Sequence, residues 1–161
     1  VDAGANIGVE DCNGQTPLHK ATIEGRIDII VYLVAQAVAQ GADLNRNGRW
    51  GTTLLHLAMA VGNINIVKYL VDAGADIGAA DCDGQTPLHL ALKGRNINVV
   101  KYLVEKGADL HARNKSKQTP LHKASMGNTK ASINNLLKLG ANVNDLDNNK
   151  RSTSLDSEIV S

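Results

Sequence analysis

Thr-Pro-Leu-His stands at residues 86–89, directly after the turn-like stretch Asp-Cys-Asp-Gly-Gln at residues 81–85. The same tetrapeptide occurs at residues 16–19 and 119–122, and the variant Thr-Leu-Leu-His occurs at residues 53–56. Successive copies begin 37, 33 and 33 residues apart, and each is followed two residues later by alanine. A repeat of this period is typical of a stacked array of small units rather than of an enzyme built around one central pocket.

The tetrapeptide predicts the start of a short helix. Threonine is a favoured N-cap, because its hydroxyl accepts a hydrogen bond from a free backbone N–H group of the first turn. Proline suits the first helical position because it has no N–H group to leave unpaired. The histidine falls where a capping box carries Glu or Gln, so its ring can bond back to the cap. Each short helix is expected to end near a glycine: Gly25, Gly62, Gly94 and Gly127.

A second, amphipathic helix is predicted after each short one. Four apolar residues in the stretch 64–71 share one helical face, and residues 27–34 and 97–104 repeat the pattern. We expect these helices to end at glycines in the left-handed conformation, namely Gly41, Gly74, Gly107 and Gly140.

Three departures from regularity carry expectations of their own. Residues 34–40 hold four extra residues rich in Ala and Gln, which predicts a second helix about one turn longer, either as a tolerated outer insertion or as a partner-specific ridge. Gly48 replaces the leading Asp of one turn and Lys117 replaces the turn glycine of another, so we expect these turns to be less rigid. Gly94 and Gly127 come one residue early, which leaves the geometry of their loops open.

The whole pattern resembles the ankyrin repeat family. The family motif Asp-x-x-Gly-x-Thr-Pro-Leu-His-x-Ala is complete at residues 11–21 and 81–91. The resemblance covers about residues 1–146 and implies an all-α ankyrin-repeat solenoid of stacked helix-turn-helix units with projecting β-turn or hairpin loops. It divides one array into a partial unit at 1–10, a first unit with the four-residue insertion at 11–47, further units at 48–80, 81–113 and 114–146, and a degenerate partial unit or cap at 147–161.

The beginning of the chain repeats a later stretch. Residues 1–21 match residues 71–91 at 16 of 21 positions. We therefore expect the chain to begin in the middle of a unit, either as a piece of a longer array or after the loss of an N-terminal cap.

No pattern of catalytic or metal-binding residues is present in the sequence. The four repeated histidines form a ladder with a local role at each helix start, and no zinc-binding spacing or phosphate loop accompanies them. No nucleophile comes with a base and an orienting group. We predict no catalytic residue, no metal site, no cofactor and no enzymatic activity of the chain by itself.

Charge is distributed unevenly along the chain. Residues 1–80 hold 5 basic and 8 acidic residues, whereas residues 81–161 hold 12 and 8. This asymmetry suggests a partner with an acidic patch facing the third and fourth units, although a merely solvated surface fits equally well. Nucleic acid is an unlikely partner, because no aromatic residues are interleaved with these charges.

The remaining composition bears on the cellular setting. No apolar run reaches the ~18 residues of a membrane span, and no secretory signal is visible. Cys12 and Cys82 occupy equivalent turns two units apart, much farther than the ~7 Å that a disulfide permits between Cα atoms. Reduced thiols favour an intracellular location, cytoplasmic or nuclear. The oligomeric state stays open, with a monomer favoured.

The resemblance implies a non-catalytic scaffold that binds a partner protein through a concave face of turn tips and first helices. The alternative is a targeting or regulatory segment of a larger enzyme, channel or effector. Trp50 is the strongest candidate contact, because it aligns with small polar residues in the other units and tryptophan and arginine dominate binding energies at interfaces; local packing on a neighbouring turn is the alternative. The positions assigned to partner contact are Glu10, Asn13, Gln15, Ile23, Glu24, Asn47, Arg49, Trp50, Thr52, Val61, Asp83, Gln85, Lys93, Arg113, Lys115, Ser116, Gln118 and Met126.

Overall fold

The computed structural model describes residues 6–94, 96–126, 130–145 and 147. In these residues the chain forms α-helices, one short 3₁₀ turn and no strand. The first helices of the four units are α1 (Pro17–Ile23), α3 (Leu54–Val61), α5 (Pro87–Lys93) and α7 (Pro120–Met126). The second helices are α2 (Ile27–Ala39), α4 (Ile64–Asp72), α6 (Ile97–Glu105) and α8 (Lys130–Lys138), and the 3₁₀ turn η1 spans Arg49–Gly51.

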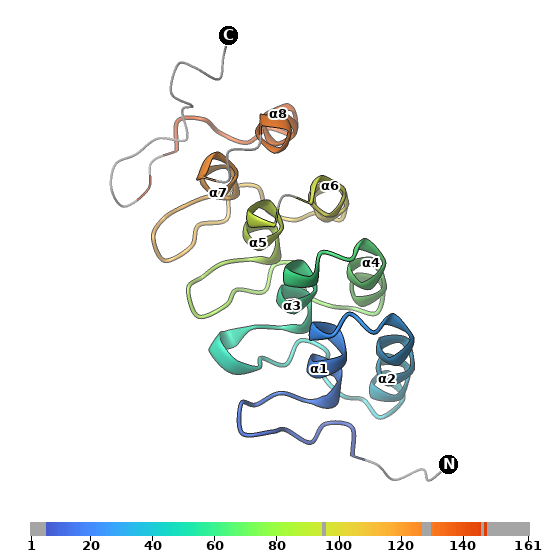
Figure 1. Ribbon diagram of the computed structural model, residues 1–161. Helices are drawn as coiled ribbons and strands as arrows, with labels where there is room; N and C mark the ends of the chain where they lie inside the picture. Colours follow the sequence, from blue (N-terminus) through green and yellow to red (C-terminus); the bar gives the residue numbers. More distant parts are fainter. Residues whose placement is uncertain (1–5, 95, 127–129, 146, 148–161) are drawn as a thin grey trace.

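The helices form two rows, and the turns project from the row of first helices, away from the second helices. Figure 1 shows the first helices in one row, the second helices in a row beside it, and the loops that precede each first helix extending away on the opposite side. Each first helix contacts the second helix of its own unit, and successive first helices from α1 to α7 contact one another. The predicted all-α solenoid is therefore confirmed.

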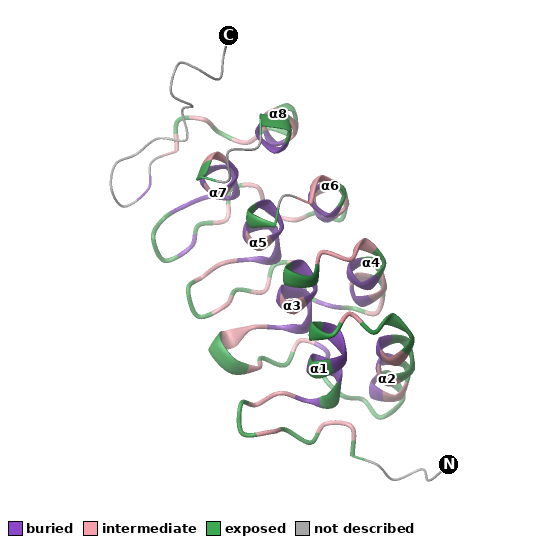
Figure 2. Ribbon diagram, in the orientation of Figure 1, coloured by how far each residue is buried: buried purple, intermediate pink, exposed green. Residues whose placement is uncertain are grey.

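The core runs as a thin layer between these rows. The leucine of each tetrapeptide is buried, and Leu55 and Leu88 have no exposed surface at all. Buried residues of the second helices, among them Ile66 and Leu103, complete the layer. Figure 2 shows the buried residues on the helix sides that face other helices, and exposed residues along the projecting turns. Stacking of units thus supplies the burial that no single unit could provide.

The helix starts follow the prediction at all four tetrapeptides. Nδ1 of His19 accepts hydrogen bonds from the Thr16 hydroxyl, 2.8 Å away, and from the Thr16 backbone N–H, 3.3 Å away. The corresponding hydroxyl-to-imidazole distances in the next three units are 2.8, 2.9 and 2.9 Å. Since Nδ1 accepts from a backbone N–H group at each of the four histidines, Nε2 is the ring nitrogen that is left to donate.

The insertion lengthens α2 as expected. This helix has 13 residues, whereas α4 and α6 have 9 each. The added turn is not confined to the outer surface, because Ala37 is buried while its neighbour Val38 is 57% exposed. The glycines predicted to end the second helices all take positive φ values, from 67° at Gly41 to 101° at Gly74. The glycines that follow the first helices differ: Gly25 and Gly62 are left-handed, whereas Gly94 caps α5 with φ −75°.

Lys117 takes a backbone conformation that ordinarily belongs to glycine. Gly14 and Gly84 have φ values of 69° and 73° in the first and third turns, and Lys117 has φ 56° at the same place in the fourth. A side chain at such φ costs about 1 kcal/mol relative to glycine, because Cβ crowds the backbone.

Lys117→Gly should therefore raise the free energy of unfolding by about 1 kcal/mol. The backbone carbonyl that accepts from Arg113 Nη1 at 3.4 Å is kept in this variant. Urea denaturation with an unchanged slope measures the gain. Lys115→Gly in the same turn, where φ is not positive, is the matched control and should give no increase; an equal gain in both variants would show that backbone strain is not the cause.

Candidate functional site

Each regular turn is closed by its leading polar residue. The Asp81 carboxylate accepts the backbone N–H groups of Asp83 and Gln85 at 2.9 and 2.8 Å. Asp11 makes the same pair of bonds to Gln15 and Asn13, and these bonds hold the pKa of Asp11 below its ordinary value. The side chain of Asn114 replaces the carboxylate in the fourth turn. These bonds fix the turn tips before any partner arrives.

Successive turns from the second unit onward are also tied to one another. The Cys82 N–H donates to the Trp50 carbonyl, and the Lys115 N–H donates to the Asp83 carbonyl, both at 2.9 Å. The histidine ladder adds a second tie, because Nε2 of His56 donates to the Gln85 carbonyl at 2.9 Å. Nε2 of His89 donates to the Gln118 carbonyl at 3.0 Å in the same way.

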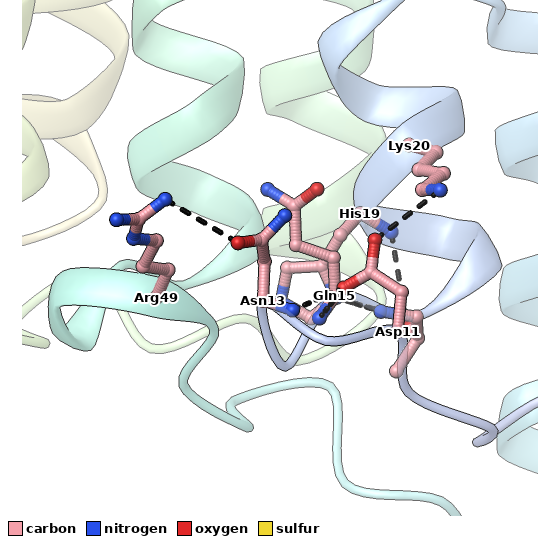
Figure 3. Close-up of polar contacts among 7 residues, drawn as sticks. Asp11, Asn13, Gln15, His19, Lys20 and Arg49 are labelled. Atoms are coloured by element: carbon pink, nitrogen blue, oxygen red, sulfur yellow. Dashed lines mark hydrogen bonds and ion pairs between the residues drawn. The ribbon is translucent and has the colours of Figure 1, made fainter.

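The joint between the first and second turns is built differently. Gly48 has no carboxylate to close its turn, and the chain instead forms η1 with Trp50 at φ 63°. Side chains bridge to the first turn: Arg49 Nη1 donates to Asn13 Oδ1 at 3.3 Å, and Arg46 pairs with Glu10 at 2.6 Å. Figure 3 shows Arg49 extending across to Asn13, beside the Asp11–Lys20 ion pair of the first turn.

The buried histidines make stability depend on pH. Burial lowers the pKa of His89 and of His19 below the ordinary 6.5, and nearby backbone groups offset this only in part. The unfolded chain therefore binds protons at a pH where the folded chain does not. The stabilisation is complete above the unfolded pKa and is lost as pH falls toward the lowered folded pKa.

We expect the free energy of unfolding to decrease from about pH 7 to about pH 5, measured by urea titration at each pH. His89→Gln should flatten this dependence, since it removes one of the groups concerned. His111→Gln, at an exposed loop position, is the control and should keep the full dependence. Identical midpoints for the natural protein at both pH values would contradict the expectation.

Most of the positions assigned to partner contact lie at the surface. Half-buried members of the set are Gln15, Thr52 and Gln85. Exposed members are Glu10, Asn13, Ile23, Glu24, Asn47, Arg49, Trp50, Val61, Asp83, Lys93, Arg113, Lys115, Ser116 and Met126. They lie on the turns and at the ends of the first helices, so the fold gathers them along one side of the array.

Gln118 is a correction to this set, because its side chain is buried. Only 7% of its surface is exposed, and Asn114 Nδ2 donates to its Oε1 at 3.4 Å. Its own Nε2 donates to the sulfur of Met126 at 3.7 Å. The fourth turn folds this side chain inward, where it braces the turn against α7 rather than facing a partner.

Trp50 stands out in the surface set. Its side chain is 64% exposed at a turn tip, and the Arg49 guanidinium lies 4.9 Å from the centre of its ring. Its backbone holds a left-handed conformation that is unusual for a bulky residue. Its carbonyl is at the same time fixed by Cys82 N–H. An exposed aromatic ring is thus presented on a strained but firmly held turn. Sequence alone showed the tryptophan but not its backbone conformation.

Some charged residues among the positions assigned to partner contact form ion pairs within the chain. Glu10 pairs with Arg46, and Arg113 pairs with Asp145 at 2.9 Å. Lys93 and Lys115 are exposed on the third and fourth units. Arg113 therefore shares its charge with a neighbouring carboxylate.

The described residues offer little basis for other chemistry. Among them, no group of three or more His, Cys, Asp or Glu side chains is arranged to hold a metal ion. Cys12 and Cys82 are free and exposed. Within the same part of the chain, every helix is too short or too polar to cross a membrane.

Comparison with known proteins gives consistent matches. The family model described as ankyrin repeats in three copies matches residues 1–81, 33–114 and 74–147. The chain is 41% identical over 71 residues to the mouse (Mus musculus) protein phosphatase 1 regulatory subunit 27, a match that covers 44% of each chain. It is 35% identical over 81 residues to the rat (Rattus norvegicus) NF-kappa-B inhibitor alpha, covering 49% of this chain and 26% of that protein. A mouse serine/threonine-protein kinase, TNNI3K, is 39% identical over 57 residues, which are 35% of this chain and 6% of the kinase. The chain thus spans less than half the length of these relatives.

Proposed function

Because this chain belongs to the ankyrin repeat family, whose repeats generally serve as protein-interaction modules, we propose that it binds a partner protein, without catalysis, through its turn tips and first helices. The relatives support this assignment, since two of them are named as a regulatory subunit and as an inhibitor. An intracellular location fits the two free thiols.

The observation that carries the proposal is the exposed Trp50 ring with Arg49 beside it. A tryptophan that is 64% exposed leaves a large apolar area in contact with water. A partner that covers the ring removes this area from water, which favours binding. Tryptophan and arginine are the residues most enriched where interfaces concentrate their energy. Strain retained at a surface position is also typical of functional sites.

Preorganisation supplies the mechanism. The turns are closed by Asp81 and its equivalents, and the second, third and fourth turns are joined by backbone hydrogen bonds. A partner therefore meets side chains that already occupy their bound positions, which lowers the entropic cost of association. The lysines of the third and fourth units, Lys93 and Lys115, would attract a partner that carries acidic side chains opposite them.

Trp50→Ala should weaken partner binding by at least ~2 kcal/mol, about 30-fold, while leaving the melting temperature nearly unchanged. The partner is first captured from cell lysate on the natural protein, and its affinity for both proteins is then measured by titration calorimetry. Loss of the ring removes the buried contact, while the backbone ties of the turn stay in place.

Tyr32→Ala is the matched control for this experiment. Tyr32 is also an exposed aromatic residue, 55% exposed, but it lies on α2 in the row of second helices. Its removal should leave affinity unchanged. If Trp50→Ala binds as tightly as the natural protein, the partner does not contact the second turn and the site lies elsewhere. If Tyr32→Ala weakens binding equally, the turn tips are not the specific surface.

A second candidate function is recruitment on behalf of a larger protein. The match to a serine/threonine-protein kinase favours this candidate, since the matched stretch is only 6% of that long chain. In that case the binding surface is the same, but binding would position an attached domain. Sequencing the full-length transcript separates the two candidates.

A further inference from the structure

A cavity of about 130 Å³ lies where the first and second units meet. Its walls come from residues 7–8 and 16 before α1, from α1, α2 and the start of α3, and from the loop that leaves α2. The lining is mostly apolar and includes Leu18, Leu33, Ala37, Leu44 and Leu54. Exposed residues of the α2 loop, Asp43 and Arg46 among them, also line the cavity and place its opening at the surface.

The insertion in α2 accounts for the space. A backbone hydrogen bond at the end of each second helix gives a common reference point. In each unit an alanine follows the helix-ending glycine, and its N–H donates to the carbonyl of the residue five positions earlier. In the later units this acceptor residue is Leu70, Leu103 or Leu136, and each of these leucines is completely buried. In the first unit the same bond, 2.8 Å long, runs from Ala42 to Ala37. The inserted turn thus places an alanine where the other units fill the core with leucine.

His19 brings an unused donor to this cavity. His56 and His89 donate from Nε2 to the carbonyl of the following turn. His19 is only 2% exposed, yet its Nε2 forms no hydrogen bond within the described residues. Gly48 of the altered second turn lies against this ring, where an added Cβ would be 3.2 Å from Cδ2 and 3.3 Å from Nε2. The backbone of Arg46 also lies near enough to raise the pKa of His19, but it forms no hydrogen bond with Nε2. A buried donor left unpaired costs about 1–3 kcal/mol, which an occupant with an acceptor would recover.

We propose that this cavity binds a small, neutral, mostly apolar molecule that carries one hydrogen-bond acceptor, such as a five- or six-membered cyclic ketone. The apolar walls receive the ring, and the ketone oxygen accepts the proton of His19 Nε2. An apolar cavity of about this size is known to take a benzene-sized guest. A charged guest is disfavoured, because the mostly apolar walls do not compensate it for the cost of leaving water. The site is independent of the turn tips that carry the proposed partner binding.

Cyclopentanone and cyclopentane make a matched pair of probes, because they differ only in the acceptor. Each is titrated into ¹⁵N-labelled protein and followed by NMR of the backbone amides and of the His19 Nε2–H group. Cyclopentanone should shift the Nε2–H signal and the amides around the cavity. Cyclopentane should bind at least about tenfold more weakly and leave the Nε2–H signal in place.

Ala37→Leu restores the side chain that the other units carry at this position, so it should fill the cavity and abolish binding of cyclopentanone. Val38→Leu, one residue further along α2 at an exposed position, is the control and should bind as the natural protein does. Equal affinity for the two probes, no response to either, or full binding by a folded Ala37→Leu protein would each overturn the proposal. The comparison of probes needs no variant, so it holds even if Ala37→Leu does not fold.

Discussion

Leu88→Ala should lower the free energy of unfolding by about 2–5 kcal/mol. Leu88 has no exposed surface, and its helix α5 packs against α3, α6 and α7 at once. Truncation removes apolar contacts and leaves a cavity that the three neighbouring helices, which are held by further contacts of their own, cannot close. Because stability in a stacked array depends on each interface between neighbours, a defect in a middle unit weakens the interfaces on both of its sides.

Urea denaturation followed by far-UV circular dichroism measures this loss. Leu139→Ala is the control, since Leu139 is 46% exposed and its truncation should cost less than about 1 kcal/mol. An unchanged midpoint for Leu88→Ala would contradict the alignment of the repeats on which the whole interpretation depends, because that alignment places this leucine in the core.

Gly84→Val is expected to cost about 3 kcal/mol or more. Gly84 has φ 73°, a conformation in which a branched side chain is strained by about 1–2 kcal/mol. The new Cβ would also lie 3.0 Å from the backbone nitrogen of Lys115 and 3.2 Å from Cα of Asn114. These are backbone atoms, so the fourth turn must move, which weakens the bond between Lys115 N–H and the Asp83 carbonyl.

Gly14→Val separates these two effects. Gly14 has nearly the same φ, 69°, but nothing lies within 4 Å of a Cβ added there. This variant should lose only the strain of about 1–2 kcal/mol. Thermal unfolding of both proteins, with partner binding as a second measurement, gives the comparison. Equal losses would mean that the contact between the third and fourth turns contributes nothing to stability.

The local structure could be predicted well from sequence because local chemistry determines it. The threonine and histidine of each tetrapeptide bond to each other three residues apart, so a four-residue motif is sufficient to specify the helix start. The added turn of α2 was predictable for the same reason, since a run of good helix formers extends a helix whose hydrogen bonds are all internal.

Features that depend on tertiary contacts could not be predicted in this way. Gln118 occupies a turn position like that of Gln85, but it is buried because the fourth turn folds against α7. Nε2 of His19 forms no hydrogen bond within the described residues, whereas the same nitrogen of His56 and of His89 bonds to the next turn, and the repeated tetrapeptide gives no sign of this difference. The proposed contact residues remain a prediction of the same kind, since they depend on a molecule outside the chain.

The side-chain bridges between the first and second turns have a mechanical consequence. Later turns share backbone hydrogen bonds, which fix their spacing, but this joint relies on Arg49 with Asn13 and on the Arg46–Glu10 ion pair. Long side chains change rotamer within nanoseconds, and exposed ion pairs weaken as salt concentration rises. The position of the first turn relative to Trp50 therefore depends on two side-chain contacts that salt weakens, while the packing of α1 against α3 holds the two units together.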